Sequence, residues 1–304
     1  VRKTVGYVHA VENVSFQIRE QETFGLVGES GCGKSTTGRT ILRLIEPTAG
    51  QVLFDGEDLC TLNREAMRQK RRDMQLVFQD PYASLNPRMT VRKLLEEPLR
   101  THFRLAQAEL DQQVSWIAGA VGLAEEQLER YPHQFSGGQR QRISIARALI
   151  TKPRFVVADE PVSALDVSIQ AQILNLLMNL QKDLKLSYLF ISHDLNVVRH
   201  ISNRGVMYLG RIVELGDTED VYCRPMHPYT QALLSAIPKK DPAEKKVRIR
   251  LEGDVPNPAS PPPGCAFHNR CPHCMDLCKE QAPESKELEP GHRVACHLYD
   301  VPRS

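Results

Sequence analysis

The sequence predicts an α/β protein whose phosphate-binding core is a mixed sheet flanked by helices, with an inserted helical subdomain and a C-terminal cysteine-rich tail. The first observation is a G-x-x-x-x-G-K-[ST] pattern at Gly28–Ser35, between a strand-like apolar run and an apolar-periodic helix. The second is a stretch over about residues 81–130 that is rich in Leu, Glu, Gln and Arg, with helical periodicity and few strand signals. The third is a cluster of cysteines between Cys265 and Cys296.

The phosphate loop is Gly28-Glu-Ser-Gly-Cys-Gly-Lys-Ser-Thr36. Its glycines let the backbone curl so that successive N–H groups point at phosphate oxygens. The helix expected over about Lys34–Ile45 adds its positive N-terminal end. Lys34 supplies a charge for the β- and γ-phosphates, and the Ser35 hydroxyl is placed to bind Mg²⁺. A nucleoside triphosphate is the expected ligand, and the residues assigned to it are Gly28, Ser30, Gly31, Cys32, Gly33, Lys34, Ser35 and Thr36.

The segment before the loop, Tyr7–Ile18, alternates apolar and polar residues and predicts edge strands. An aromatic side chain just upstream of a phosphate loop can stack on adenine, so Tyr7 is a candidate for that contact. The alternatives are that Tyr7 is an ordinary strand aromatic and that the stacking residue lies before Val1.

Further strands and helices alternate along the chain, as expected for an α/β core. Strands are predicted at Thr23–Val27, Gly50–Gly56, Asp73–Gln79, Arg154–Glu160 and Ser187–Ser192, helices at Ile143–Leu149, Val167–Leu184 and His227–Ala236, and a hairpin at Gly205–Gly216 that turns at Leu209–Arg211. The predicted division is a core in two parts (1–80 and 151–236), a helical subdomain (81–150) and a C-terminal Pro/Cys-rich extension (237–304), entered through a charged linker at Pro238–Glu244.

A second glycine-containing turn, Ser136-Gly-Gly-Gln139, runs directly into a helix. Backbone N–H groups and a helix N-terminus would again face outward, which suits an anion. The three residues Ser-Gly-Gly are a weak pattern alone, but the longer run Ser136–Arg142 before a helix is a specific one.

Polar residues follow two of the buried strands. Asp159 and Glu160 end one strand: the first suits Mg²⁺ coordination through water, and the second suits a base that orients and deprotonates an attacking water. The alternative is that these acids cap the next helix. His193 ends another strand of the same sheet, where it could reach a γ-phosphate, although a histidine at a strand end is more often structural.

Composition limits the remaining possibilities. The formal net charge of +2 over 304 residues does not call for nucleic acid as a partner. The sequence lacks an apolar run near the ~18 residues that span a bilayer and a charged-then-apolar signal segment at its start. At a membrane, the protein is therefore expected to be peripheral and cytoplasmic.

The clustered cysteines predict a metal site, because an ATP-using chain without a signal peptide works in a reducing compartment where disulfides are uncommon. Cys265, Cys271, Cys278 and Cys296 lie in one turn-rich segment, and Cys274 forms a C-x-x-C pair with Cys271. An iron–sulfur centre and zinc both suit such thiolates. Zinc could also use His268, His273, His292 or His297, and free thiols or disulfides remain possible. The expected role is structural, since the proline-rich tail has little apolar content.

In this order, the motifs resemble those of the nucleotide-binding subunits of ABC transporters. The matching residues are the phosphate loop, Gln79, Ser136–Gln139, Asp159, Glu160, Ser163–Asp166 and His193, over about residues 1–235. The resemblance implies a P-loop ABC ATPase core and two such domains packed head to tail. Ser136, Gly137, Gly138 and Gln139 of one domain then cap the γ-phosphate bound by the other, and Asp166 bridges the halves. Glu160 polarises water, His193 holds the γ-phosphate, and Gln79 contacts Mg²⁺ or water and senses the membrane partner.

A closer resemblance, to the ATP-binding subunits of dipeptide/oligopeptide (peptide–nickel) importers, comes from Phe78–Arg88, His227–Thr230 and Pro261–Cys271. It implies a peripheral protein on the cytoplasmic face of the inner membrane, with a different sister ATPase in a heterodimer and two permease subunits. A periplasmic or extracellular peptide-binding protein acts indirectly. It also implies a [4Fe–4S] cluster on Cys265, Cys271, Cys278 and Cys296, with Cys274 as a departure from the pattern.

Other functions remain to be weighed. An ABC ATPase that acts on nucleic acid would need a long coiled coil or a zinc-bearing insert between Gln79 and Ser136, where this sequence fits only a compact helical subdomain. An ABC subunit of a soluble enzyme complex has a similar core, but the long Pro- and Cys-rich tail favours the importer. Nickel chelates and glutathione-like peptides are alternative cargoes.

Overall fold

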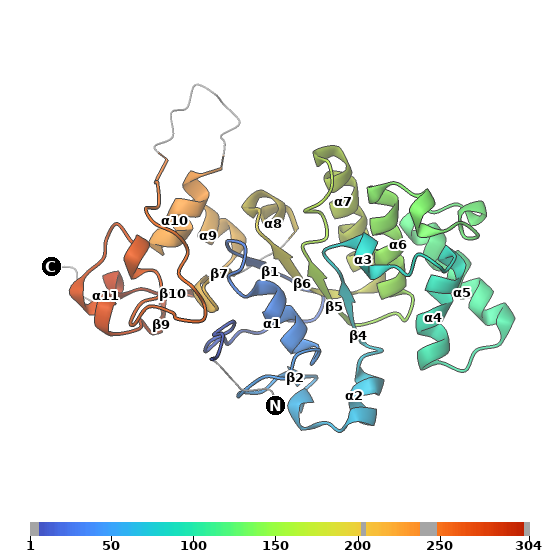
Figure 1. Ribbon diagram of the computed structural model, residues 1–304, viewed down its shortest axis with the longest axis horizontal. Coiled ribbons are helices and arrows are strands. Elements are labelled where there is room, and N and C mark those ends of the chain that lie inside the picture. The colour runs from blue at the N-terminus through green and yellow to red at the C-terminus, as the bar shows by residue number, and fades with distance from the viewer. Residues whose placement is uncertain (1–5, 202–204, 238–247, 301–304) are drawn as a thin grey trace. The chain divides into compact units, whose positions relative to one another are not determined.

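The computed structural model describes residues 6–201, 205–237 and 248–300 (Figure 1). The chain forms two compact units. The loop unit contains Val1–Gln17, Phe24–Thr37 and Ser192–Ser304, and the helical unit contains Ile18–Thr23 and Gly38–Ile191.

The helical unit holds three parallel strands in the order β4 (Met74–Val77), β5 (Phe155–Asp159) and β6 (Ser187–Ser192). In register, Met74 lies opposite Phe155, and Phe155 lies opposite Ser187. All five residues of β5 are buried, as expected for a parallel strand covered on both faces. Because the strands are parallel, their carboxyl ends lie at one edge, where Gln79 and Glu160 follow β4 and β5.

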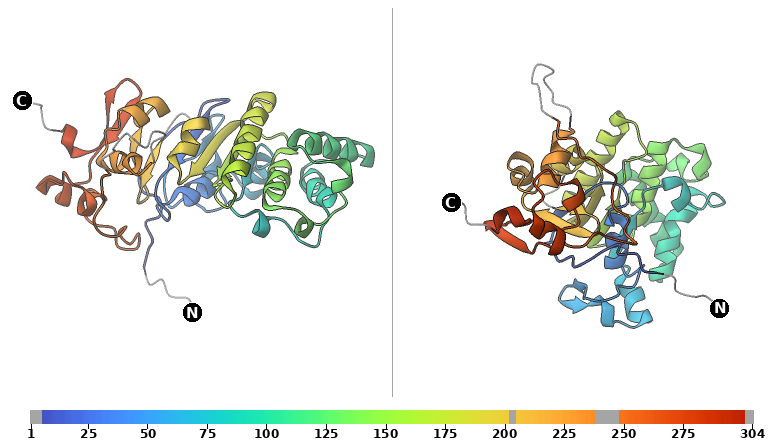
Figure 2. Two further views of the ribbon diagram at one scale, coloured as in Figure 1. Left: turned by 90° about the horizontal axis from the view of Figure 1, so that it is seen from above. Right: turned by 60° about the vertical axis from the view of Figure 1, so that its left-hand side comes forward.

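The helices of this unit include two that are long and amphipathic, α5 (Gln107–Val121) and α7 (Val167–Leu184), and their apolar stripes are buried. Helices α4 (Val91–His102) and α5 lie beside α6 (Gly137–Leu149) in each view (Figure 2). The helices are α2 (Arg64–Lys70), α3 (Pro81–Ser84), α4 (Val91–His102), α5 (Gln107–Val121), α6 (Gly137–Leu149) and α7 (Val167–Leu184), with short strands β2 (Leu53–Phe54) and β3 (Glu57–Asp58) and 3₁₀ turns at Leu59–Thr61, Glu125–Gln127 and Pro132–Gln134.

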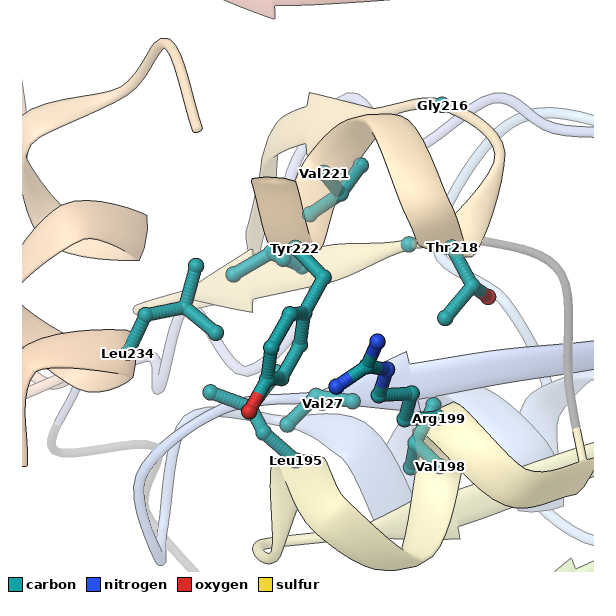
Figure 3. Close-up of a pocket in the computed structure, with 11 residues that line it drawn as sticks. Val27, Leu195, Val198, Arg199, Gly216, Thr218, Val221, Tyr222 and Leu234 are labelled. Atoms are coloured by element: carbon teal, nitrogen blue, oxygen red, sulfur yellow. The ribbon is translucent and has the colours of Figure 1, made fainter. Parts of the chain in front are cut away.

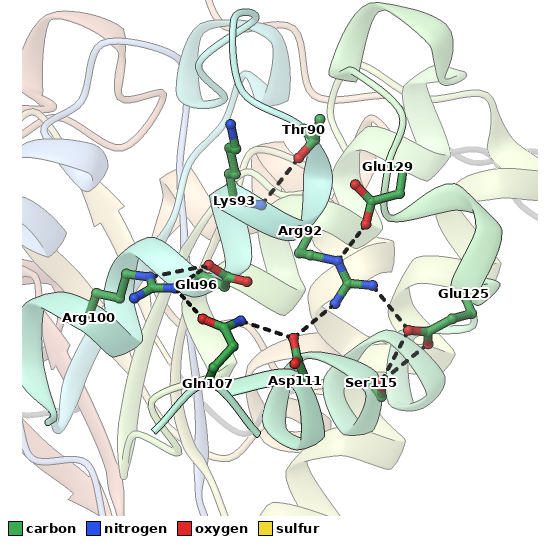
Figure 4. A network of polar contacts seen from close by, with 10 residues as sticks. All are labelled: Thr90, Arg92, Lys93, Glu96, Arg100, Gln107, Asp111, Ser115, Glu125 and Glu129. Atoms are coloured by element: carbon green, nitrogen blue, oxygen red, sulfur yellow. Dashed lines mark hydrogen bonds and ion pairs between the residues drawn. The ribbon is translucent and has the colours of Figure 1, made fainter. Parts of the chain in front are cut away.

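A polar network connects α4 to α5 and to the following turn (Figure 4). Its centre is the Arg92 guanidinium, which donates to Glu129 at 2.5 Å, to Glu125 at 3.3 Å and to Asp111 at 3.5 Å. One cation therefore offsets three carboxylates that would otherwise repel one another.

Replacement of this cation should weaken the helical unit. We expect Arg92→Met to lower the free energy of unfolding by about 1 kcal/mol, because the pairs are partly exposed but act as a network. Urea denaturation measures the change, and Lys93→Met, on the same helix, is the matched control. An equal loss in both variants would show that the charge network contributes nothing of its own.

Within its described residues, the loop unit contains five strands, in the order β1 (Thr23–Val27), β7 (Val206–Tyr208), β8 (Arg211–Leu215), β10 (His292–Ala295) and β9 (Ser285–Glu289). Only the β1–β7 pair among these is parallel. Leu209 and Gly210 form the β7–β8 turn with φ values of 41° and 76°, as a tight hairpin requires. The last hairpin, β9–β10, belongs to the cysteine-rich tail and pairs with β8, so the tail adds strands to the sheet of its unit.

An aromatic cluster forms part of the core of the loop unit. The ring of Tyr208 lies 4.6 Å from that of Tyr229 and 5.1 Å from that of Phe267, all edge-on. These residues come from β7, α10 and the tail, so the cluster joins segments that are far apart in the sequence. The unit also contains α8 (Leu195–Ile201), α9 (Thr218–Cys223), α10 (Pro228–Ser235), α11 (Asp276–Glu280) and 3₁₀ turns at His268–Arg270 and His297–Tyr299, and α1 (Lys34–Ile41) begins in it.

Two predictions of local structure were wrong. Tyr7–Ile18 contains bends and forms no strand, and Asn13 within it has a positive φ of 50°, which a regular strand does not accommodate. Helix α1 ends at Ile41 rather than near Ile45, since Arg43 adopts a left-handed φ of 48°. The predicted linker Pro238–Glu244 lies outside the described residues.

A small cavity in the loop unit is apolar (Figure 3). Its volume of about 20 Å³ is room for about one water molecule. The Arg199 guanidinium lies 4.0 Å from the centre of the Tyr222 ring and covers one side of the cavity. The cavity is too small for a nucleotide. None of the described helices is both long and apolar enough to cross a bilayer.

Candidate functional site

The phosphate loop lies in the loop unit, between β1 and α1. Two of its glycines are required by close packing. A Cβ on Gly28 would lie 2.1 Å from the Met207 carbonyl oxygen, and a Cβ on Gly33, whose φ is 101°, would lie 2.0 Å from the Ala10 carbonyl oxygen. The loop is thus pressed against β7 on one side and the N-terminal segment on the other, which fixes its path.

The Lys34 side chain folds back over this loop. It is only 4% exposed, and its Nζ donates to the carbonyl oxygens of Gly28 and Glu29, both at 2.8 Å. The ammonium group therefore lies within the curl of the loop, where a phosphate would meet it. Ser35 and Thr36 are half-buried in the first turn of α1, and Ser30 and Gly31 are exposed. Cys32 is buried, which raises the pKa of its thiol.

The predicted acidic pair lies in the helical unit at the carboxyl end of β5. Asp159 is 2% exposed, with an Oδ2 4.0 Å from Nη2 of Arg39. Glu160 has a left-handed φ of 45°, and its N–H donates to Ile191 at 3.0 Å. Gln79, from the end of β4, donates to the Glu160 carboxylate at 2.9 Å. Two residues 81 positions apart in sequence are thus brought into contact at one strand edge.

The glycine turn Ser136–Gln139 forms the N-terminus of α6 in the same unit. Ser136 and Gln139 make a reciprocal capping box, in which the Gln139 N–H donates to Ser136 Oγ at 3.4 Å and the Ser136 N–H to Gln139 Oε1 at 3.1 Å. A Cβ on Gly138 would lie 2.5 Å from the Ile169 side chain on α7, and one on Gly137 would lie 3.4 Å from Leu165. A side chain at position 138 would therefore collide with Ile169 of α7, whereas the space at Gly137 would admit a Cβ at ordinary contact distance.

Three other residues that were predicted to contact the nucleotide or the partner domain are exposed. Asp166 is exposed and precedes the first residue of α7 as its N-cap. His193 is exposed directly after β6, in the loop unit. Tyr7 is 79% exposed. The structure thus groups Gln79, Asp159 and Glu160 in one unit and the phosphate loop with His193 in the other.

Four of the tail cysteines, Cys265, Cys271, Cys278 and Cys296, are neighbours in the loop unit. Burial and then the neighbouring thiols Cys265, Cys271 and Cys278 raise the pKa of Cys296 to about 12. Burial also raises the pKa of Cys265 to about 11, and the Cys265 N–H donates to the Cys278 carbonyl at 2.8 Å. Among residues 6–201, 205–237 and 248–300, however, no three His, Cys, Asp or Glu side chains are arranged to hold a single metal ion.

One feature of the loop is absent from the sequence predictions. Glu29 is held by Arg270 of the tail and by the hydroxyl of Tyr229. Tyr229 lies in the motif that begins at His227, and Arg270 directly precedes Cys271, but nothing in their spacing indicates a partner on the phosphate loop.

Comparison with known proteins agrees with these features. Residues 11–163 match the family model described as "ABC transporter", and residues 213–278 match "Oligopeptide/dipeptide transporter, C-terminal region". An oligopeptide transport ATP-binding protein of Bacillus subtilis, AppF, is 56% identical over 302 residues, which are 98% of this chain and 92% of that protein.

Solved structures show the same fold. One is a dimeric ATP-binding cassette, MJ0796, in a post-hydrolysis state with ADP and Pi, at 31% identity and a TM-score of 0.65 over 72% of this chain and 94% of the other. Another is CbiO1 of Clostridium perfringens, part of an ABC transporter complex, at 26% identity and a TM-score of 0.65 over 71% and 84%. The chain therefore belongs to the ATP-binding proteins of the ABC transporter family, in the group that carries the oligopeptide/dipeptide transporter C-terminal region.

Proposed function

We propose that this chain is the ATP-hydrolysing subunit of an ABC importer for dipeptides and oligopeptides. The observation that carries the proposal is the combination of the phosphate loop and acidic strand end with a C-terminal region typical of peptide transporters. The 56% identity to an oligopeptide transport ATP-binding protein over nearly the whole chain supports the same cargo class.

In the proposed reaction, the phosphate loop binds the ATP phosphates through its backbone N–H groups, and Lys34 offsets their charge. Ser35, Gln79 and, through water, Asp159 would hold Mg²⁺, which when bound neutralises charge on the phosphates. Glu160 accepts the proton of the attacking water. Its carboxylate is oriented by the Gln79 amide, so the residue that would sense the membrane partner also positions the base. His193 holds the γ-phosphate.

A single chain has one complete set of these motifs, so two ATP-binding subunits are needed. Ser136, Gly137, Gly138 and Gln139 would cap the γ-phosphate bound by the partner, and the bare backbone at the start of α6 suits that role. Asp166 would connect the two halves. The partner is a sister ATPase in a heterodimer that sits on two permease subunits at the cytoplasmic face of the inner membrane, and ATP drives closure by binding the closed state better.

Reconstitution tests this function. The chain is co-expressed with a sister ATPase and two permeases from its own genome and placed in liposomes with the matching binding protein. ATP hydrolysis should rise when that protein carries a di- or oligopeptide. Stimulation by a nickel chelate alone would instead assign a metal-chelate cargo, and purification with a soluble enzyme complex would remove the importer function.

We also propose that Cys265, Cys271, Cys278 and Cys296 hold a [4Fe–4S] cluster that stabilises the tail. One zinc ion with bonds of about 2.3 Å would need its thiolates to converge within about 4 Å of one another. In a four-iron cluster, each thiolate binds a different iron atom, so the four thiols need not converge on one point. The arrangement of neighbouring thiols is compatible with such a cluster.

Anaerobic purification tests the cluster. The protein should contain about four irons and four sulfides per chain and absorb broadly near 400 nm. Cys278→Ala should lose the iron, because its side chain is buried at the site, whereas the control Cys274→Ala should keep it. One zinc per chain with little iron would replace the cluster with a zinc site, and loss of iron in Cys274→Ala would change the ligand set.

A further inference from the structure

The first residue after the leading glycine of the phosphate loop makes an ion pair with the tail. Arg270 donates to Glu29 through two nitrogens, Nη1 to Oε2 at 2.7 Å and Nη2 to Oε1 at 3.1 Å. The side chain of Arg270 is 8% exposed and that of Glu29 is 27% exposed. Such a planar, two-point pair away from bulk water is more specific and stronger than a surface ion pair.

The backbone of Glu29 is held as well. Its N–H donates to the Tyr229 hydroxyl at 2.9 Å. Tyr229 is fully buried and packs edge-on against Tyr208 and against Phe267 of the tail. The Tyr208 hydroxyl lies 3.5 Å from Nη1 of Arg270. Both the main chain and the side chain of Glu29 therefore depend on one cluster, to which the tail contributes Phe267 and Arg270.

A second connection holds the segment that carries Tyr229. Glu214 on β8 is fully buried and accepts the N–H groups of Met226 and His227 at 2.8 and 2.9 Å. The same carboxylate is 2.8 Å from Nε2 of His292 on β10 of the tail. The N-terminal end of α10, and with it Tyr229, is thus attached to the tail hairpin.

The negative charge of Glu29 explains how the ion pair would affect nucleotide binding. A carboxylate at the second position of the loop would repel the negative phosphates that the loop binds, and that repulsion is strong where water is partly excluded. Arg270 offsets the Glu29 charge and turns its carboxylate toward the tail. It also orders the first turn of the loop before nucleotide arrives, which lowers the entropy lost on binding.

We propose that Arg270 is a positioning residue of the nucleotide site: through Glu29 it sets the affinity of the phosphate loop for ATP and makes that affinity depend on an ordered cysteine-rich tail. This proposal rests on the proposed function only in that the loop binds ATP. Arg270 would affect ATP binding far more than the hydrolysis of bound ATP, since its side chain donates hydrogen bonds to Glu29 of the loop and to the Tyr208 hydroxyl, neither of which is assigned a part in hydrolysis.

The test is calorimetric titration of the full chain with MgATP, in four forms: wild type, Arg270→Met, Glu29→Gln and the double variant. Arg270→Met should raise the Kd about tenfold, within the range measured for contacting charged pairs. Glu29→Gln alone should change the Kd by less than about threefold, since it removes the repulsive charge along with the pair. The double variant should bind ATP more tightly than Arg270→Met, because the exposed carboxylate is gone.

Two further variants separate positioning from general stability. Arg224→Met removes an ion pair to Glu289 of the tail that does not touch the loop, and its Kd should match wild type. Arg270→Lys keeps the positive charge but loses the two-point contact, so its Kd for MgATP should lie between those of wild type and Arg270→Met. This variant also tests the proposal if Arg270→Met does not fold. In the assembled complex, Arg270→Met should raise the KM for ATP with kcat within about twofold of wild type.

Several results would overturn the proposal: an unchanged Kd in Arg270→Met, an equal rise in Arg224→Met, a double variant as weak as Arg270→Met, or a fall in kcat at unchanged KM. Failure of the importer function would look different. Transport or peptide stimulation would then be missing in the wild-type complex, while the differences in Kd among the loop variants would persist.

Discussion

Glu160→Gln should bind ATP with nearly wild-type affinity and hydrolyse it about 1,000-fold more slowly, the range expected when a general base is removed. An amide has no free electron pair of sufficient basicity to take the proton of water. The change is nearly isosteric, and the new amide can still pair with Gln79, which now lies 2.9 Å from the carboxylate. The positive φ of 45° at this position is a property of the backbone that the substitution leaves in place.

Single-turnover hydrolysis and an ATP-binding titration measure the two effects separately. Glu126→Gln is the control, since Glu126 is an exposed carboxylate of the same unit in the 3₁₀ turn Glu125–Gln127. If Glu160→Gln still turned over ATP at a substantial rate, the base would have to be another group. If it lost ATP binding, the carboxylate would act in nucleotide or metal binding rather than in proton transfer.

Lys34→Ala should lose about 100-fold in ATP affinity, because charge-assisted hydrogen bonds to phosphate contribute about 1.5–3 kcal/mol each. The structure adds a second consequence. The ammonium donates to the carbonyl oxygens of Gly28 and Glu29, so its removal also leaves two loop carbonyls without that donor. We therefore expect a modest fall in thermal stability together with the loss of binding.

Equilibrium binding of MgATP measures the affinity, and circular dichroism follows unfolding. Lys182→Ala, an exposed lysine on α7, is the control. Affinity near the wild-type value would show that the loop backbone alone holds the phosphates. A large loss of stability with no folded fraction would make the binding change a folding effect, and Lys34→Arg, which keeps the donor to the carbonyls, would then report the role of the ammonium.

Much of the local structure could be predicted from the sequence. Helix α7 and strand β6 begin and end at the predicted residues, and so does β1. These elements have strong apolar patterns and clear stop signals, such as the polar residues after β6. The prediction failed where one residue adopts a left-handed backbone, at Asn13 and Arg43. Asparagine adopts this conformation more often than most residues but does not require it, and arginine gives no such signal, so neither position could be predicted with certainty from the sequence.

The predicted site residues are motif residues, and motifs could be found because the chemistry of phosphate binding limits the residue types and their spacing. The contacts among these residues depend on the fold and are harder to predict. The pairing of Gln79 with Glu160 follows from parallel strands that end at one edge, and the sequence analysis did not predict this contact. The roles of these residues in catalysis, and of Ser136, Asp166 and His193, stay predictions.

Sequence alone was enough to identify the phosphate loop, the acidic strand end, the glycine turn before α6 and the cysteine spacing, because each is a short segment whose chemistry depends on neighbours along the chain. The ion pair between Arg270 and Glu29, 241 residues away, and the hydrogen bond from the Glu29 N–H to Tyr229 became visible only in the folded chain. Such contacts depend on the path of the whole chain through the loop unit. The residues next to Arg270 and Glu29 in the sequence do not indicate that the two side chains pair. Packing of the aromatic cluster brings them within hydrogen-bond distance.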